Sequence, residues 1–308
     1  MTGRAANRWT NRTARWGQRR PTLCSFALLF LSCLFLHAAD KNIIFIAGGP
    51  SHAAGEHEYR AGCLLLKKCL DALPGINSVV HSNGWPKEAS ALNDAAAIII
   101  YSDGGPRHPV LQNDHRKILG RVLEKGAGLG CIHFAVEIPR TNGGPEFLQW
   151  VGGYYEVGFS INPVWTPEFF RLPDHPIARG VKTFSLKDEW YFNIRFPADQ
   201  HALIPILFST PSDKVRLGPY RDRYPEVEKN FGRDETLMWA LKRPGPNDGR
   251  SFGFTGGHFH KNWGDANFRK LVLNAILWIA KAEISSNGVQ SVITEHDLSQ
   301  NLDEGKNK

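Results

Sequence analysis

"NIIFIAGG", residues 42–49, is the stretch that decides the fold of this chain. Its unbroken apolar run, closed by two glycines, is typical of a strand that is buried on both faces in a parallel sheet. The same pattern returns in "AAAIIIYSDGG" at 95–105 and in "GLGCIHFA" at 128–135. Helical apolar spacing occupies the intervals, at 58–75 and 110–128. The alternation predicts right-handed βαβ units around a mostly parallel sheet, which is an α/β fold.

The rest of the chain divides into three parts. Residues 137–240 mix proline, aromatic and charged residues, so we expect an insertion of loops and short edge strands there. Residues 265–283 carry an apolar stripe at helical spacing, with Asp265 placed to cap the helix. Residues 284–308 are polar, and we expect a frayed or extended tail. The sequence therefore predicts one α/β domain over residues 40–283.

The first 39 residues differ from the rest in composition. They hold six arginines and no acidic residue, followed by the apolar run "LCSFALLFLSCLFLHAA" and then Asp40. A basic start, a short apolar run and small residues before a charge are typical of a signal peptide. The run is shorter than the roughly 20 residues of a spanning helix, so cleavage is favoured over retention as a membrane anchor. We expect removal of residues 1–39 and export of a mature chain without a membrane span, to the periplasm or the extracellular space.

The net charge of +7 comes mainly from this leader. Without its six arginines, 31 basic residues face 30 acidic ones, so we expect no basic surface for nucleic acid. Three cysteines remain, Cys63, Cys69 and Cys131, all in apolar elements. Because Cys63 and Cys69 point to different faces of one helix, a disulfide framework is not expected.

Histidines and carboxylates follow the ends of the predicted strands. In open α/β sheets, ligands bind beyond the carboxyl ends of the parallel strands. We therefore expect the side chains at these ends to line one rim. They are Ser51, His52, His57 and Glu58 after the first strand, Asp103 and His108 after the "IIIY" strand, His133 and Glu137 after the "GLGCI" strand, and His258 and His260 after the last strand.

The segment "TGGHFHKNWG" carries the sharpest local pattern. His258 and His260 alternate along extended backbone and therefore share a face. Two imidazoles on one face suit a divalent metal such as zinc or manganese, or acid–base chemistry near neutral pH. A metal needs a further ligand, for which His133, Glu189 and the first loop, at 51–58, are candidates. No dinucleotide-binding, phosphate-loop or Cys-x-x-Cys motif in the sequence indicates another cofactor.

"DEWYFNIRF", residues 188–196, places the adjacent acids Asp188 and Glu189 beside Trp190 and Tyr191. Aromatic rings that pack on the C–H faces of a sugar, next to carboxylates that accept from its hydroxyls, indicate a saccharide site. We expect Trp263 to contribute to the same site. The alternative is that the acids lie in a surface loop and the tryptophans in the hydrophobic core.

Five segments resemble the trehalose-utilisation (ThuA-like) family: "PSHAAGEHEYRAGCLLLKKCL", "CIHFAVE", "HPIARGV", "DEWYFNIRF" and "FGFTGGHFHKNWG". The resemblance implies the class I glutamine amidotransferase-like superfamily, with a flavodoxin-like three-layer α/β sandwich. Amidotransferases carry a nucleophilic cysteine at the strand exit, where this chain has His133, while Cys131 lies deeper in the strand. Cys-dependent amidotransferase chemistry is therefore not expected.

The resemblance also implies a function and a set of recurring polar residues. The family name implies disaccharide catabolism, and related pathways oxidise a sugar to its 3-keto form before they cleave it. The recurring polar positions match His57, Glu58, His133, Glu189, Tyr191 and His258.

Two functions fit these features. The first is an exported lyase or hydrolase that acts on a disaccharide, a glycoside or its 3-keto derivative. His133 or His258 would act as the base and Glu189 as the partner acid, while His260 or a metal would stabilise the enolate oxygen. The second is a non-catalytic sugar-binding module or a partner subunit, alone or as an oligomer. The expected saccharide-binding residues are His57, Glu58, Asp103, Trp190, Tyr191 and Trp263, and the expected metal ligands are His133, His258 and His260.

Overall fold

The computed structural model describes residues 40–218 and 229–304. The expected signal peptide therefore lies outside the described residues, as do the last four residues of the expected tail.

A seven-stranded sheet forms the centre of the described chain, in the order β2-β1-β3-β4-β11-β10-β9. The five strands from β2 to β11 are parallel to one another, and β10 is antiparallel to both of its neighbours, β11 and β9. This confirms the prediction of a mostly parallel sheet. The strands are β1 (Lys41–Ala47), β2 (Ile76–His81), β3 (Ala97–Tyr101), β4 (Gly128–Ile132), β9 (Leu203–Ser209), β10 (Glu235–Lys242) and β11 (Arg250–Phe254).

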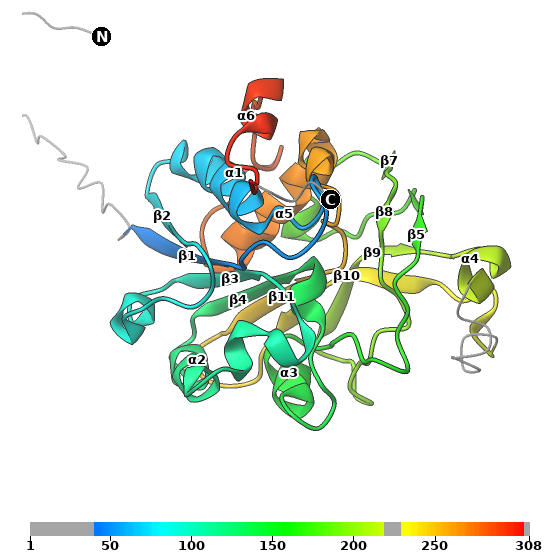
Figure 1. Cartoon of the computed structure of the whole chain (residues 1–308), viewed down its shortest axis with the longest axis horizontal. Helices are drawn as coiled ribbons and strands as arrows, with labels where there is room; N and C mark the ends of the chain where they lie inside the picture. Colours follow the sequence, from blue (N-terminus) through cyan, green and yellow to red (C-terminus); the bar gives the residue numbers. More distant parts are fainter. Residues whose placement is uncertain (1–39, 219–228, 305–308) are drawn as a thin grey trace, which may run out of the picture. The chain divides into compact units, whose positions relative to one another are not determined.

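Helices cover both faces of the sheet and complete three layers. Figure 1 shows α1 (Tyr59–Asp71) and α5 (Ala266–Ile279) on one face, and α2 (His115–Glu124) and α3 (Gly144–Trp150) on the other. Alternate residues of β1 belong to the two cores, because successive side chains of a strand point to opposite faces. Among the described residues, no helix is both long enough and apolar enough to cross a membrane.

Short elements complete the structure. Residues 137–240 hold two small antiparallel pairs, β5 with β8 and β6 with β7, besides the edge strand β9. The remaining elements are β5 (Val164–Trp165), β6 (Glu168–Phe169), β7 (Phe184–Ser185), β8 (Asp188–Glu189), α4 (Asp213–Leu217), α6 (Glu295–Ser299) and the 3-10 helices η1 (Ala89–Leu92), η2 (Gly105–Arg107), η3 (Pro109–Leu111), η4 (His133–Val136), η5 (Pro176–Ala178) and η8 (His260–Gly264).

The polar tail folds back on the domain instead of fraying. Thr294 begins α6 with a capping box, and Asp297 of that helix pairs with Lys68 of α1. Further along, the Asp303 N–H donates to Glu58 Oε2 at 2.7 Å. Ile284 and Val289 of the tail are buried in the hydrophobic core, and Ile293 and Leu298 pack against it, so apolar as well as polar contacts dock the tail.

Two local predictions are confirmed. Asp265 caps α5, where its carboxylate accepts from the N–H groups of Asn267 and Phe268 at 2.9 Å each. Cys63, Cys69 and Cys131 are free and buried. Burial raises the pKa of the Cys131 thiol well above its ordinary value, so the group is a protonated core residue.

Candidate functional site

Three histidines and a glutamate meet at the carboxyl end of the parallel strands. His57 follows β1, His133 begins η4 directly after β4, and His258 follows β11. Glu189 is delivered by β8, from the insertion. One ligand atom from each of these four residues lies within 4.8 Å of the other three. We call His57, His133, Glu189 and His258 the four-residue cluster.

The donor atoms of the four-residue cluster are closely spaced. His57 Nε2 lies 2.9 Å from His258 Nδ1 and 3.1 Å from His133 Nε2. Glu189 Oε2 lies 3.4 Å from both His133 Nε2 and His258 Nδ1. A tetrahedral zinc ion with bonds of about 2.0–2.1 Å needs donors about 3.3–3.4 Å apart. Four of the six distances between the donor atoms, at 2.9–3.4 Å, are therefore close to those of a tetrahedral zinc site, and the other two are within 4.8 Å.

Neighbouring groups determine which nitrogen of each ring carries a proton. His133 Nδ1 lies 2.7 Å from the Thr255 carbonyl oxygen, which can only accept, so Nδ1 donates and Nε2 is left with its lone pair. Tyr59 gives its proton to Asp103 Oδ1 at 2.8 Å and therefore accepts from His57 Nδ1 at 2.6 Å. His57 Nε2 is thus also unprotonated in the neutral ring.

The two unprotonated nitrogens face each other at 3.1 Å, where their lone pairs repel unless a cation or a proton lies nearby. Two neighbours can each donate a hydrogen bond to one of these nitrogens. The Tyr191 hydroxyl lies 3.1 Å from His133 Nε2, and His258 Nδ1 lies 2.9 Å from His57 Nε2. Such outer contacts also orient histidines in metal sites, where the ring nitrogen away from the ion donates to a carbonyl or carboxylate. For His258, the acceptor on the far side of the ring is Glu56, which lies 3.5 Å from His258 Nε2.

The charges within the cluster are strongly coupled. Burial acts to raise the pKa of Glu189, but the contacts with His133 and His258 outweigh it and hold this pKa at about 2. Burial also acts to lower the pKa of His258, but Glu189, with Glu56 and Asp188, raises it above its ordinary value. In the absence of a metal, the cluster therefore holds a carboxylate beside a histidine that readily gains a proton.

Glu137 is a second carboxylate near the cluster, with a different titration. Burial raises its pKa to about 7, with smaller contributions from the charges of Glu189 and Asp103. Its side chain is partly buried and packs against Gly104 and Gly105, where an added Cβ would lie within 2.9 Å of Glu137 atoms. A carboxylate with this pKa can both take and return a proton near neutral pH.

Backbone strain accompanies two of the cluster residues. His57 and His133 have φ of 48° and 54°, in the left-handed region that non-glycine residues seldom occupy. Such conformations cost roughly 1–3 kcal/mol each and persist where the surrounding structure enforces them. At His133 the strain lies at the sharp turn from β4 into η4, the strand exit at which we expect an active-site residue from the sequence.

Asp188 fixes the loop that carries His258. Its buried carboxylate accepts from three successive backbone N–H groups, of Gly257 at 2.8 Å, His258 at 3.0 Å and Phe259 at 3.4 Å. Asp188 thus positions the imidazole through the backbone, while the adjacent Glu189 contacts it directly.

Replacing Asp188 with asparagine is expected to destabilise the chain by roughly 1–3 kcal/mol, because the amide has only one accepting oxygen and at least one buried N–H group then faces an NH2 donor. Urea unfolding measures the change. Asp199→Asn is the matched control, since the Asp199 side chain is 80% exposed and its replacement should leave the midpoint unchanged. Equal midpoints for both variants would contradict the role of Asp188.

Four expected site residues have other roles. His260 Nε2 bonds to the Leu298 carbonyl oxygen at 3.0 Å and is not part of the cluster, which corrects the expectation that it shares a metal with His258. Glu58 is buried and accepts from the N–H groups of Gly55 and Asp303, so it joins the first loop to the tail. Trp190 and Trp263 are completely buried core residues, so neither ring can stack on a sugar here.

The other expected residues lie at the site. Tyr191 is buried with its hydroxyl on His133, which makes it a polar neighbour of the cluster rather than a stacking platform. Asp103 accepts from Ser51 and Tyr59 and pairs with Arg107. His57, expected to bind substrate, is at the centre of the cluster. The sequence does not predict the role of Glu137. Burial raises its pKa, and that burial depends on tertiary packing.

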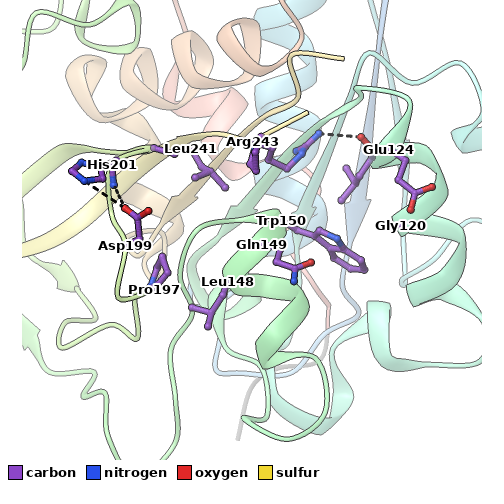
Figure 2. A pocket seen from close by; sticks show the side chains of 13 residues that line it. Gly120, Glu124, Leu148, Gln149, Trp150, Pro197, Asp199, His201, Leu241 and Arg243 are labelled. Atoms are coloured by element: carbon purple, nitrogen blue, oxygen red, sulfur yellow. Dashed lines mark hydrogen bonds and ion pairs between the residues drawn. The ribbon is translucent and has the colours of Figure 1, made fainter. Parts of the chain in front are cut away.

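A cavity of about 520 Å³ lies away from the four-residue cluster. Figure 2 shows its lining side chains, which include Trp150, Leu241 and Arg243. Arg243 donates to the carbonyl oxygen of Ala127, directly before β4, so the cavity lies at the amino ends of the parallel strands. The cluster lies at the opposite edge, and we place the functional site there because the titratable groups converge there.

Comparison with known proteins supports the resemblance seen in the sequence. Residues 51–279 match the ThuA family, described as "Trehalose utilisation". A search of curated proteins found no match. The fold is similar to crystal structures of a ThuA-like protein from Bacteroides uniformis (TM-score 0.55, 18% identity, 80% of this chain and 93% of that chain) and one from Parabacteroides merdae (TM-score 0.54, 17% identity, 82% and 93%). At these identities the structures confirm the fold alone. The family match covers more than half of the chain, and the protein therefore belongs to the ThuA family.

Proposed function

We propose that this chain is an exported enzyme of carbohydrate breakdown and that the four-residue cluster holds a divalent cation, zinc or manganese. The observation that carries the proposal is the convergence of three imidazole nitrogens and one carboxylate oxygen, with four of their six mutual distances between 2.9 and 3.4 Å and all within 4.8 Å. The family description supports a saccharide as the substrate. The basic, then apolar leader supports export.

The reaction that fits the site best is an elimination on a 3-keto-glycoside. The C3 carbonyl acidifies the proton on C2, so a base can remove that proton. The electron pair then forms the C1–C2 double bond, the C1–O bond breaks, and the released aglycone oxygen takes a proton. A divalent cation held by these four residues would have to accept the carbonyl oxygen as a further ligand, and it would then polarise the carbonyl and stabilise the enolate charge. No oxidant or reductant is consumed in this step.

The residues of the chain divide the work of this elimination. Glu137, with a pKa of about 7, is the proposed base, and its protonated form can then give the proton to the departing oxygen. Tyr59 and Asp103 fix the tautomer of His57, and the Thr255 carbonyl fixes that of His133. We therefore propose Glu137 as the base in place of His133 or His258. Both histidines contact Glu189 within the cluster and would be ligands of the cation, so they would not be available to accept the proton.

Purified protein is expected to contain close to one zinc or manganese ion per chain. His133→Ala and His258→Ala are each expected to weaken metal binding by at least about 100-fold, since loss of a direct ligand should exceed the effect of losing an outer partner. Metal content by mass spectrometry and competition with a chelator measure this. His201→Ala is the control, because the side chain of His201 is 99% exposed.

The outcomes of this experiment separate the candidate functions. Metal lost in both cluster variants and kept in the control would support the proposal. No metal, even after reconstitution with zinc and with manganese, would contradict the cation. Saccharide binding without turnover would then favour a non-catalytic sugar-binding module.

A further inference from the structure

A second cavity lies beside the cluster, between β1 and β3, where the crossover connections change from one face of the sheet to the other. It has a volume of about 330 Å³ and follows the carboxyl ends of β1, β2 and β3. In the order β2-β1-β3, the connections leave β1 and β3 toward opposite faces, which opens a crevice between their ends. The cavity is lined by Gly48 and Gly49, which directly follow β1, and by Ser102 and Asp103, which directly follow β3.

We propose that this cavity, lined also by Asn83, Trp85, Arg107 and His115, is a second sugar subsite that makes the substrate a disaccharide. This inference rests on the proposed function, because it places the keto sugar at the cluster and the departing sugar in the cavity. The volume is at the low end for small-molecule sites, which fits one sugar ring.

The walls of the cavity suit a sugar ring. Trp85 and His115 stack with ring centroids 4.4 Å apart and an interplanar angle of 6°, and this pair forms an aromatic wall for the C–H face of a pyranose. The amides of Asn83 and Gln112, which also line the cavity, can both donate to and accept from hydroxyls.

The charges favour a neutral ligand over a phosphate or a carboxylate. Arg107 Nη2 lies 3.0 Å from Asp103 Oδ2, so the guanidinium that lines the cavity is already paired with an anion. A polyhydroxyl ligand can bond to this ion pair without leaving a net charge uncompensated, whereas an anion would compete with Asp103.

Asp103 connects the cavity with the cluster. Its Oδ2 faces Arg107, while its Oδ1 accepts from Tyr59, the hydroxyl that holds His57. A saccharide that occupies both regions would place its glycosidic bond near Asp103, and the charge of Asp103 also contributes to the titration of Glu137. The bond to be broken would thus lie between the aromatic wall and the cluster.

The test compares the binding of trehalose with that of methyl glucoside, by titration calorimetry on the purified chain. The unmodified chain is expected to bind the disaccharide at least about tenfold more tightly, and Trp85→Ala to abolish this preference. Lys87→Ala, an exposed neighbour in the same loop that does not line the cavity, should retain it.

A second variant guards against a folding defect in Trp85→Ala. Gly49→Leu should fill the cavity, because a Cβ at Gly49 meets only Asn83 Oδ1 within 4 Å, at 3.7 Å, which is an ordinary contact. Both variants should keep their metal, if the unmodified chain binds one. Equal affinities for the two sugars, or a preference unchanged in Trp85→Ala and Gly49→Leu, would overturn the subsite. Absence of metal or turnover in the unmodified chain would instead count against the proposed function, while the sugar preference would still decide the subsite.

Discussion

Replacing Glu137 with glutamine is expected to lower the turnover of a 3-keto-glycoside by about 100- to 10,000-fold, the range that a positioned acid–base group contributes. Glutamine keeps the shape of the side chain but cannot accept the C2 proton. Burial, together with the charges of Glu189 and Asp103, sets the pKa of Glu137 at about 7, so a large fraction is deprotonated at neutral pH. Release of 4-nitrophenol from 4-nitrophenyl 3-keto-glucoside gives the rate.

The pH profile tests the same assignment independently. A base works in its deprotonated form, so the rate of the unmodified chain should rise with pH and level off above the pKa of Glu137. A cation bound beside Glu189 would lower this pKa, so the inflection is expected at or below about pH 7. Glu137→Gln should lose this inflection and keep its metal. Glu124→Gln is an exposed control on α2. An unchanged rate and profile in Glu137→Gln would exclude Glu137 as the base.

Lowering the pH from 7 to 5 is expected to weaken zinc binding by about 30- to 100-fold, because protons compete for the imidazole nitrogens. Although burial acts to lower the pKa of His258, Glu189, Glu56 and Asp188 raise it above the ordinary value. Below this raised pKa zinc must displace a proton from His258, and each pH unit then costs about tenfold in affinity. Above it, the affinity should level off.

Glu189→Gln provides the contrast for the pH experiment. The variant loses a carboxylate ligand, so its affinity at neutral pH should be lower. It also loses the charge that raises the pKa of His258, so its decline should begin at a lower pH. Chelator competition between pH 5 and 8 gives both curves. An affinity that does not change across this range would contradict histidine ligands.

The fold could be predicted from the sequence because its central strands are marked locally. "NIIFIAGG", "AAAIIIYSDGG" and "GLGCIHFA" each lie in the sheet in the parallel arrangement that continuous apolar runs indicate. The rule that ligands bind at the carboxyl ends of such strands was enough to bring His57, His133 and His258 together. Both predictions, of the central strands and of the residues at their carboxyl ends, used only the order and spacing of apolar and polar residues along the chain.

The remaining site residues depend on information that the sequence does not display. His258 and His260 share a face only if the backbone stays extended, but η8 begins at His260 and turns its ring toward the tail. Trp190 is surrounded by Phe169, Phe254 and Phe268, which are distant in the sequence. Local composition therefore could not separate a sugar platform from a core residue, and Trp85 carried no local signal of a site.

The docked tail has a consequence for the order in which the site is completed during biosynthesis. It bonds to Glu58, next to His57, and to His260, two residues beyond His258, so it supports two of the loops that carry the cluster. Those contacts form only after residues 298–303 have been synthesised. A nascent chain that has already made all four cluster residues would still lack the support of both loops, and metal loading is therefore expected to follow, rather than guide, the folding of this domain.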